Sequence, residues 1–216
     1  MKNLIIVDDH AMLREGISSW ILKNSEWHIL IAAEDLEDLK KKFASTGLKM
    51  DTPADGNITV SVVDLSYKSV TYGKEEEAGW DIISWLKDKN IPTIVFSSHD
   101  SGHCIERAMS SAVGAKGFVS KCSTEKNLLE AINTVAEGRT YIQPDLFSNM
   151  IQSRSLFQVL SPKEQQVAEL ILEGCENSEI SEKLSLNIRT VENYISKLYD
   201  KCGTDSRKEL IQLLSV

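Results

Sequence analysis

In the first 137 residues, short apolar runs alternate with longer segments whose apolar residues recur at helical spacing. The short runs predict strands, at residues 3–8, 28–33, 58–64, 93–97 and 117–120. The longer segments predict helices, at residues 11–23, 35–45, 79–89, 102–113 and 123–137. Short apolar strands that alternate with amphipathic helices are typical of an α/β domain, in which a parallel sheet has helices on both faces. Ligands of such sheets bind beyond the carboxyl ends of the strands.

After residue 138 the pattern changes. The following stretch has no clear period and predicts a linker, and beyond Leu160 the pattern is entirely helical. Four short helices are predicted there, at residues 162–173, 177–184, 188–201 and 205–214. Ser161, Pro162 and Glu164 predict the start of the first of these helices, and Asn177 is a candidate N-cap for the second. We therefore expect three segments: an α/β domain at 1–138, a linker at 139–156 and a small all-α domain at 157–216.

Composition agrees with an ordinary globular protein, because 42% of the 216 residues are hydrophobic and 26% are charged. The net charge of −8 does not suggest a nucleic-acid partner, so DNA binding would need a local basic patch. The four cysteines form no C-x-x-C pair and have no histidine at metal-ligand spacing, which predicts free thiols in a reducing compartment. No apolar run is long enough for a signal peptide or a membrane span, and we expect a cytosolic protein with no membrane partner.

Polar residues with complementary chemistry follow four of the predicted strands. Asp8 and Asp9 follow the first strand, Asp64 ends the third, Ser97 ends the fourth and Lys121 follows the fifth. Carboxylates that meet at one edge repel one another unless a cation joins them, and hard oxygen ligands suit Mg²⁺. Together with a hydroxyl and an ammonium, they predict a site that handles a phosphoryl group. A single aspartate at a strand end would be read as a solvated side chain or a helix cap.

Residues 3–137 resemble the receiver domain of response regulators, which has a flavodoxin-like five-stranded sheet. The resemblance is carried by IIVDDH (5–10), VVDLS (62–66), VFSS (95–98) and GAKGFVSK (114–121). It implies that Asp64 accepts a phosphoryl group and that Asp8, Asp9, Asp64 and the backbone carbonyl of Ser66 hold Mg²⁺. It also implies phosphoryl contacts from Ser97 and Lys121 and a switch role for Phe118, which the residues alone would place in the core.

One segment departs from the receiver pattern. Lys68 stands where that family has a proline, and Gly79, which opens the next helix, follows Asp64 by 15 positions. The segment contains the acidic run Glu75 to Glu77 and is interpreted either as a solvated insertion or as a loop that docks a partner. This loop, together with Ser-Glu-Trp at 25–27, resembles the Rcs-type capsule regulators.

In the second domain, two helices joined by a tight turn at 185–187 predict a helix-turn-helix. About residues 157–214 resemble the LuxR-type DNA-binding domain of NarL/FixJ regulators, through LSPKEQQVAELILEG, NSEISEKL and RTVENYISKLYDKCG. The resemblance implies a recognition helix at 188–201. Its candidate DNA-binding residues are Arg189, Thr190, Asn193, Ser196, Lys197 and Lys201. Because residues 157–216 carry seven basic and ten acidic side chains, we expect a monomer to bind DNA weakly. A purely helical dimerisation domain is the alternative.

Together these features predict a transcriptional response regulator rather than an enzyme. A histidine kinase or phosphotransfer protein would phosphorylate Asp64, and the altered receiver would release or dimerise the second domain on promoter DNA. A regulator of the same fold that acts without phosphorylation, or as a heterodimer with another regulator, is a second hypothesis. A phosphohydrolase is a third, although the sequence offers no separate acid–base residue. His10 and His99 are near the site in sequence but are expected to be surface residues.

Overall fold

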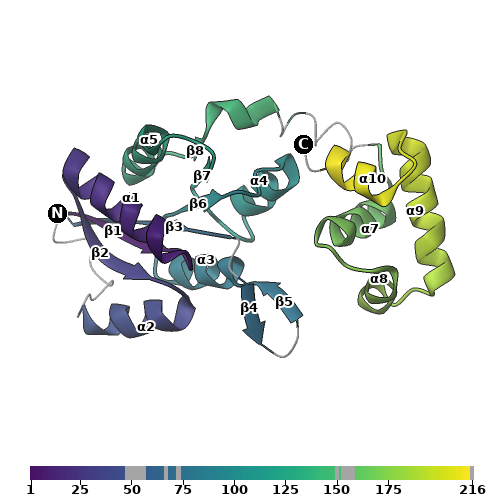
Figure 1. Ribbon diagram of the computed structural model, residues 1–216, viewed down its shortest axis with the longest axis horizontal. Coiled ribbons are helices and arrows are strands. Elements are labelled where there is room, and N and C mark those ends of the chain that lie inside the picture. Colours follow the sequence, from purple (N-terminus) through teal and green to yellow (C-terminus); the bar gives the residue numbers. More distant parts are fainter. Residues whose placement is uncertain (47–56, 66–67, 72–73, 149–150, 152–158, 215–216) are drawn as a thin grey trace. The chain divides into compact units, whose positions relative to one another are not determined.

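The computed structural model describes residues 1–46, 57–65, 68–71, 74–148, 151 and 159–214 (Figure 1). The chain divides into two compact units. The first unit consists of Met1–His99 with Arg107–Pro144, and the second consists of Asp100–Glu106 with Asp145–Val216. Each unit has a hydrophobic core of its own.

The first unit is built on a parallel sheet that contains all five predicted strands. These are β1 (Lys2–Val7), β2 (Trp27–Ala33), β3 (Ile58–Val63), β6 (Thr93–Ser97) and β7 (Gly117–Ser120). The strand order is β2-β1-β3-β6-β7-β8, in which every neighbouring pair runs parallel. The four strands that precede the predicted site residues are therefore consecutive in the sheet.

Helices cover both faces of this sheet, as the alternating pattern predicts. They are α1 (Ala11–Asn24), α2 (Leu36–Ser45), α3 (Ala78–Asp88) and α5 (Glu125–Ala136). Helix α4 (Gly102–Met109) is divided between the two units, because its residues up to Glu106 belong to the second. Figure 1 shows α1 and α5 over one face and α2 and α3 over the other. Helix α4 ends four residues earlier than the predicted residue 113 and gives way to a turn that Gly114 closes with a φ of +85°.

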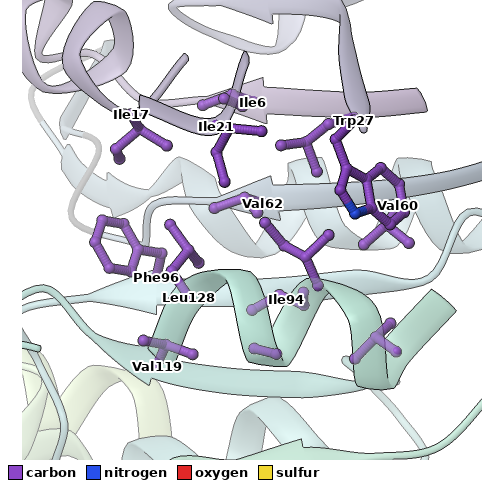
Figure 2. Packing of buried hydrophobic residues seen from close by; sticks show 14 of the residues in the cluster. Ile6, Ile17, Ile21, Trp27, Val60, Val62, Ile94, Phe96, Val119 and Leu128 are labelled. Atoms are coloured by element: carbon purple, nitrogen blue, oxygen red, sulfur yellow. The ribbon is translucent and has the colours of Figure 1, made fainter. Parts of the chain in front are cut away.

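The core under α1 and α5 consists of alternate residues of the strands and the inward stripe of each helix (Figure 2). Ile6, Val62 and Ile94 from the sheet meet Ile21 of α1 and Ile132 of α5, and each is at most 2% exposed. Side chains on successive strand positions point to opposite faces. For this reason the continuous apolar runs of the sequence can fill a core on each side of the sheet.

Two elements lie where the sequence predicts none. A short sixth strand, β8 (Tyr141–Ile142), pairs with β7 inside the predicted linker, and a 3₁₀ turn, η2 (Pro144–Leu146), follows it. Tyr141 and Leu146 are buried. The expected five-stranded sheet thus has six strands, and the chain leaves the sheet later than residue 138. A two-residue strand has no detectable period, which is why the sequence pattern misses it.

A hairpin is also present where the sequence predicts no strand, in the long segment after Asp64. Strand β4 (Lys68–Thr71) pairs antiparallel with β5 (Lys74–Glu77) in a sheet of their own. The segment returns to its starting point: a Cβ atom on Gly79 would lie 2.6 Å from both the carbonyl oxygen of Asp64 and the Cα atom of Leu65. The hairpin therefore lies between two stretches of backbone that are in contact with each other. For this reason the length of the insertion need not displace Asp64.

The second unit contains all four predicted helices, α7 (Pro162–Leu172), α8 (Asn177–Leu184), α9 (Ile188–Cys202) and α10 (Arg207–Leu214). Its core is formed by Val167, Ile171, Ile180, Val191, Ile195, Leu198, Leu210 and Leu214. The turn between α8 and α9 uses Ser185 in the left-handed region, at a φ of +52°. One predicted cap is wrong: Glu176, not Asn177, is the N-cap of α8, and Asn177 accepts a hydrogen bond from Arg207 instead.

A buried ion pair joins the start of α7 to the end of α9. The capping box predicted at Ser161 and Glu164 is present, and Glu164 is only 4% exposed. Its carboxylate lies 2.6 Å from Nζ of Lys201, which also donates to the carbonyl oxygen of Val159. The hydrogen bond from Lys201, helped by the backbone N–H of Ser161, lowers the pKa of Glu164 from 4.5 to about 2.

Membrane insertion through a helix finds no support in the described part of the chain, where no helix has both the length and the apolar character that a span requires. All four cysteines are free thiols, as predicted.

The contact at Gly79 predicts that this position does not tolerate a side chain. Gly79→Ala should lower the free energy of unfolding by about 1–3 kcal/mol, because the new methyl group must push α3 away from the backbone of Asp64 and Leu65. Gly16→Ala is the matched control, since nothing lies within 4 Å of a Cβ there. Equal stability of the two variants in urea unfolding would contradict the described path of the insertion.

The pair between Glu164 and Lys201 predicts an acid-dependent loss of stability. A pKa held below its unfolded value stabilises the fold fully above pH 4.5, and this contribution disappears as the pH falls toward 2. Glu164→Gln should therefore cost about 1–3 kcal/mol at pH 7 and progressively less below pH 4.5. Urea unfolding followed by circular dichroism measures this, with the exposed Glu182→Gln as control. A difference from wild type that does not change with pH would refute the role of the ion pair.

Candidate functional site

The polar residues that follow the central strands converge at one edge of the sheet. The backbone holds them in place: the N–H of Asp64 donates to the carbonyl oxygen of Val7, and the N–H of Lys121 donates to that of Ser97, both at 2.9 Å. Asp8, Asp64 and Ser97 are each at most 3% exposed. The register of β1, β3, β6 and β7 thus assembles the site that the sequence predicts at their carboxyl ends.

Lys121 bridges two of the carboxylates. Its Nζ lies 2.8 Å from Oδ2 of Asp8 and 2.7 Å from Oδ2 of Asp64. Burial alone would lower the pKa of Lys121, but the hydrogen bonds to Asp64 and Asp8 outweigh burial and raise it above its ordinary value. Lys121 therefore stays positively charged between the two buried carboxylates and offsets their mutual repulsion.

Asp9 and His10 lie on the open side of the same cluster. The side chain of Asp9 is 31% exposed and that of His10 is 67% exposed. Ligand atoms of Asp8, Asp9, His10 and Asp64 all lie within 4.8 Å of one another, a spacing that could hold a metal ion. Three of these four groups are carboxylates, which are oxygen donors of the kind that Mg²⁺ prefers. The residue set therefore fits the cation predicted from the sequence.

Two further predicted residues of this unit lie in neighbouring strands, Ser97 at the end of β6 and Phe118 within β7. The hydroxyl of Ser97 accepts a hydrogen bond from the backbone N–H of His99, at 3.0 Å. Phe118 is fully buried in β7, one residue before Val119 of the core under α1 and α5. Ser66, the predicted carbonyl ligand, lies outside the described residues.

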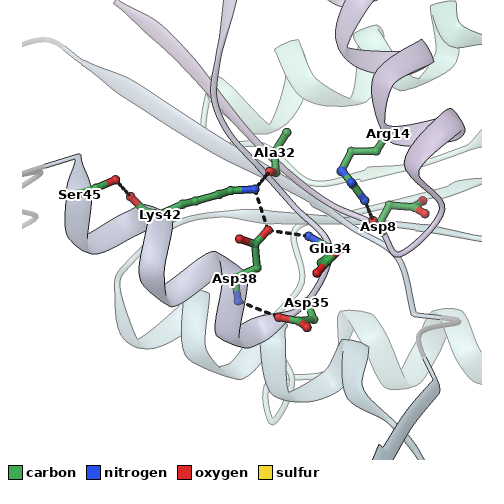
Figure 3. Close-up of polar contacts among 8 residues, drawn as sticks. All are labelled: Asp8, Arg14, Ala32, Glu34, Asp35, Asp38, Lys42 and Ser45. Carbon is green, nitrogen blue, oxygen red and sulfur yellow. Dashed lines mark hydrogen bonds and ion pairs between the residues drawn. The ribbon is translucent and has the colours of Figure 1, made fainter.

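Arg14 is a neighbour of the site that the sequence did not reveal. It lies in the first turns of α1, and its guanidinium donates to the backbone carbonyl of Asp8 (Figure 3). The same view shows Lys42 joined to Asp38 and to the carbonyl oxygen of Ala32, at 2.7 Å each. The hydrogen bond from Lys42 lowers the pKa of Asp38 despite the opposing effect of burial. The sequence offers one sign of this contact: Arg14 is a basic residue in the predicted helix that follows Asp8 and Asp9.

In the second unit, helix α9 presents one face to the core and another to solvent. Val191, Ile195 and Leu198 are buried, whereas Arg189, Asn193, Ser196 and Lys197 are exposed and Thr190 is half-buried. Lys197 lies over the ring of Tyr194, with Nζ 5.6 Å from the ring centre. Lys201 differs from the other candidates, because its ammonium is engaged by Glu164.

The chain is similar in sequence to known bacterial regulatory proteins. Residues 158–214 match the family model of bacterial regulatory proteins of the luxR family. The transcriptional regulatory protein UhpA of Salmonella typhimurium is 29% identical over 97% of this chain and 96% of its own length. The oxygen regulatory protein NreC of Staphylococcus aureus is 26% identical over 97% of this chain and 94% of its own.

Solved structures show the same two-domain fold. A structure of two RcsB dimers bound to two parallel DNAs has a TM-score of 0.65 and 23% identity, and the match covers 99% of this chain and 97% of the other. RcsB of Salmonella enterica serovar Typhimurium, bound to a promoter with the phosphomimetic BeF₃⁻, has a TM-score of 0.63.

The match to the luxR family and the full-length relatives agree with one another. These similarities support a DNA-binding transcriptional response regulator of the NarL/FixJ type, whose residues 158–214 match the luxR family.

Proposed function

We propose that Asp64 is the phosphoacceptor of this regulator and that its phosphorylation controls binding to promoter DNA. The observation that carries the proposal is the bridge of Lys121 between Asp8 and Asp64, at 2.8 and 2.7 Å. The ammonium of Lys121 is held beside the buried carboxylate of Asp64 and is in place to meet the charge of an incoming phosphoryl group.

In the proposed reaction, a carboxylate oxygen of Asp64 attacks phosphorus. The bond between phosphorus and the donor, a histidine nitrogen of a kinase or phosphotransfer protein, breaks in the same transfer. The donor leaves with the electron pair of that bond, and Asp64 becomes an acyl phosphate. Lys121 then exchanges its contact with the carboxylate for a contact with a phosphoryl oxygen.

Asp8, Asp9 and Asp64 would hold Mg²⁺ during this transfer, with the carbonyl oxygen of Ser66 as a further ligand. The bound ion supplies positive charge that offsets the charge of the phosphoryl oxygens. Arg14 supports the cluster from α1, since its hydrogen bond holds the peptide that follows Asp8.

The new phosphoryl group would shift the receiver between two conformations. Ser97 is fixed beside Asp64 by the strand order and can donate its hydroxyl hydrogen to a phosphoryl oxygen. Phe118 is buried in the adjacent β7 and would follow the movement of Lys121 three residues later. We propose that this change promotes dimerisation, through a population shift between two states of the receiver.

The exposed face of α9 is proposed to enter the major groove of DNA. Asn193 would read a base edge, whereas Arg189 and Lys197 would hold phosphates, with Thr190 and Ser196 at their sides. Lys201 supports the helix through Glu164 rather than adding a full charge to this face. With so few free cations, two copies on adjacent half-sites would bind far more tightly than one. The RcsB structures, described as dimers bound to DNA, support this form of binding.

Phosphorylation of Asp64 is tested with acetyl phosphate and Mg²⁺. Intact mass spectrometry should show one phosphoryl group on wild-type protein and none on Asp64→Asn, because the amide oxygen is a poor nucleophile. Chelation of Mg²⁺ should also abolish incorporation.

Asp81→Asn is the matched control, since Asp81 lies on the exposed side of α3. Incorporation into Asp64→Asn equal to that of wild type would refute the proposed acceptor. A folded wild-type protein that gains no phosphoryl group would favour a regulator that works without phosphorylation, with the β4–β5 hairpin as the place to seek its partner.

The role of α9 is tested with DNA duplexes selected from a random pool by the phosphorylated protein. Asn193→Ala should weaken discrimination at one base position by about 1–3 kcal/mol. Lys197→Ala should weaken binding to all sequences alike and reduce the salt slope by about one unit. Lys163→Ala, an exposed lysine of α7, is the control and should change neither quantity. Full affinity in both α9 variants would place the DNA interface elsewhere.

A further inference from the structure

The side chain of His10 points toward the carboxylate cluster rather than toward the helix that it precedes. His10 occupies the N-cap position of α1, but its side chain makes no capping hydrogen bond. Instead its Nδ1 lies 2.7 Å from Oδ1 of Asp9 and 3.5 Å from Oδ1 of Asp8. The imidazole nitrogen therefore faces the carboxylates of the proposed metal site.

The two oxygens of Asp8 divide the cluster into two sides. Oδ2 faces Lys121, at 2.8 Å. Oδ1 accepts the backbone N–H of His10, at 2.8 Å, and also faces the imidazole of that residue. The backbone bond fixes the start of the His10 side chain next to Asp8, so the ring needs little movement to reach any ion that Asp8 and Asp9 hold.

The separations are those of ligands on a common ion. Two donor atoms about 2.1 Å from one cation and at right angles to each other lie roughly 3.0 Å apart. The distances from Nδ1 of His10 to the oxygens of Asp9 and Asp8, 2.7 and 3.5 Å, lie on either side of that value. Because His10 is 67% exposed and Asp9 is 31% exposed, an ion can reach this side from solvent.

We propose that His10 is a nitrogen ligand of the receiver's metal site, which therefore also takes a borderline first-row divalent ion such as Co²⁺, Ni²⁺ or Zn²⁺, and takes it more tightly than Mg²⁺. The inference rests on the proposed function, since it uses the same carboxylates. Imidazole suits these ions and adds little for Mg²⁺, which prefers oxygen and gives up its waters reluctantly. His10 thus sets which divalent ion the regulator holds at a given supply of metals.

Isothermal titration calorimetry of the full chain with Co²⁺ and, separately, with Mg²⁺ tests the proposal. Wild-type protein should bind Co²⁺ at least about tenfold more tightly than Mg²⁺. His10→Ala and His10→Asn should lose about tenfold or more of the Co²⁺ affinity and change the Mg²⁺ affinity by less than about twofold. The visible spectrum of bound Co²⁺ should also change in both variants, because it responds to the replacement of a nitrogen ligand.

His28→Ala is the control for unspecific binding to an exposed histidine and should leave both affinities unchanged. Unchanged Co²⁺ affinity in the His10 variants would overturn the proposal, as would an equal loss for both ions, which would mean that His10 only orders the loop. Wild-type protein that binds Mg²⁺ no better than an Asp9→Ala, Asp64→Asn double variant would instead refute the proposed phosphoacceptor site itself.

Discussion

The buried bridge of Lys121 to Asp8 and Asp64 is the interaction on which the receiver site depends. Two carboxylates buried this close together repel each other, and the ammonium of Lys121 offsets that repulsion. Lys121 can bridge them only because β1, β3, β6 and β7 are consecutive in the sheet. Without that strand order, the same residues would be separate polar groups at separate strand ends.

A buried carboxylate paired with a lysine also stabilises the helical unit. Glu164 at the start of α7 pairs with Lys201 near the end of α9, so a carboxylate offsets the charge of one of the three basic residues of α9. The acidic chain then has only Arg189 and Lys197 on that helix to meet phosphates. In the proposed function, weak binding by one copy makes DNA occupancy depend on a second copy, which gives phosphorylation a route to control DNA binding.

The insertion after Asp64 lengthens the connection between β3 and α3, while the residues at the strand ends stay together. Contact between Gly79 and the backbone of Asp64 and Leu65 closes the excursion at its base. The helix that follows therefore starts against the backbone at the end of β3, and the β4–β5 hairpin lies between these two points in the sequence.

Much of this architecture could be predicted from the sequence, because strong periods and the strand-end rule depend on local pattern alone. The positions of Asp8, Asp64, Ser97 and Lys121 at the ends of apolar runs are enough to predict that they meet at one edge. The pattern missed β8, which is too short to have a period, and the hairpin, because Lys and Glu are not typical strand residues. It also missed the partners of Arg14 and Lys201, because neither contact follows from the periodic pattern: Arg14 reaches back to the backbone of Asp8, and Lys201 pairs with Glu164 on another helix.

The central claim is that chemistry at Asp64 changes the affinity for DNA. The most direct measurement is the dissociation constant for a selected DNA duplex, before and after treatment with acetyl phosphate and Mg²⁺, for wild-type protein and Asp64→Asn. Phosphorylation should tighten binding of wild-type protein by roughly 5–150-fold and leave the variant unchanged. An unchanged wild-type affinity despite complete phosphorylation, or an equal gain in the variant, would contradict it.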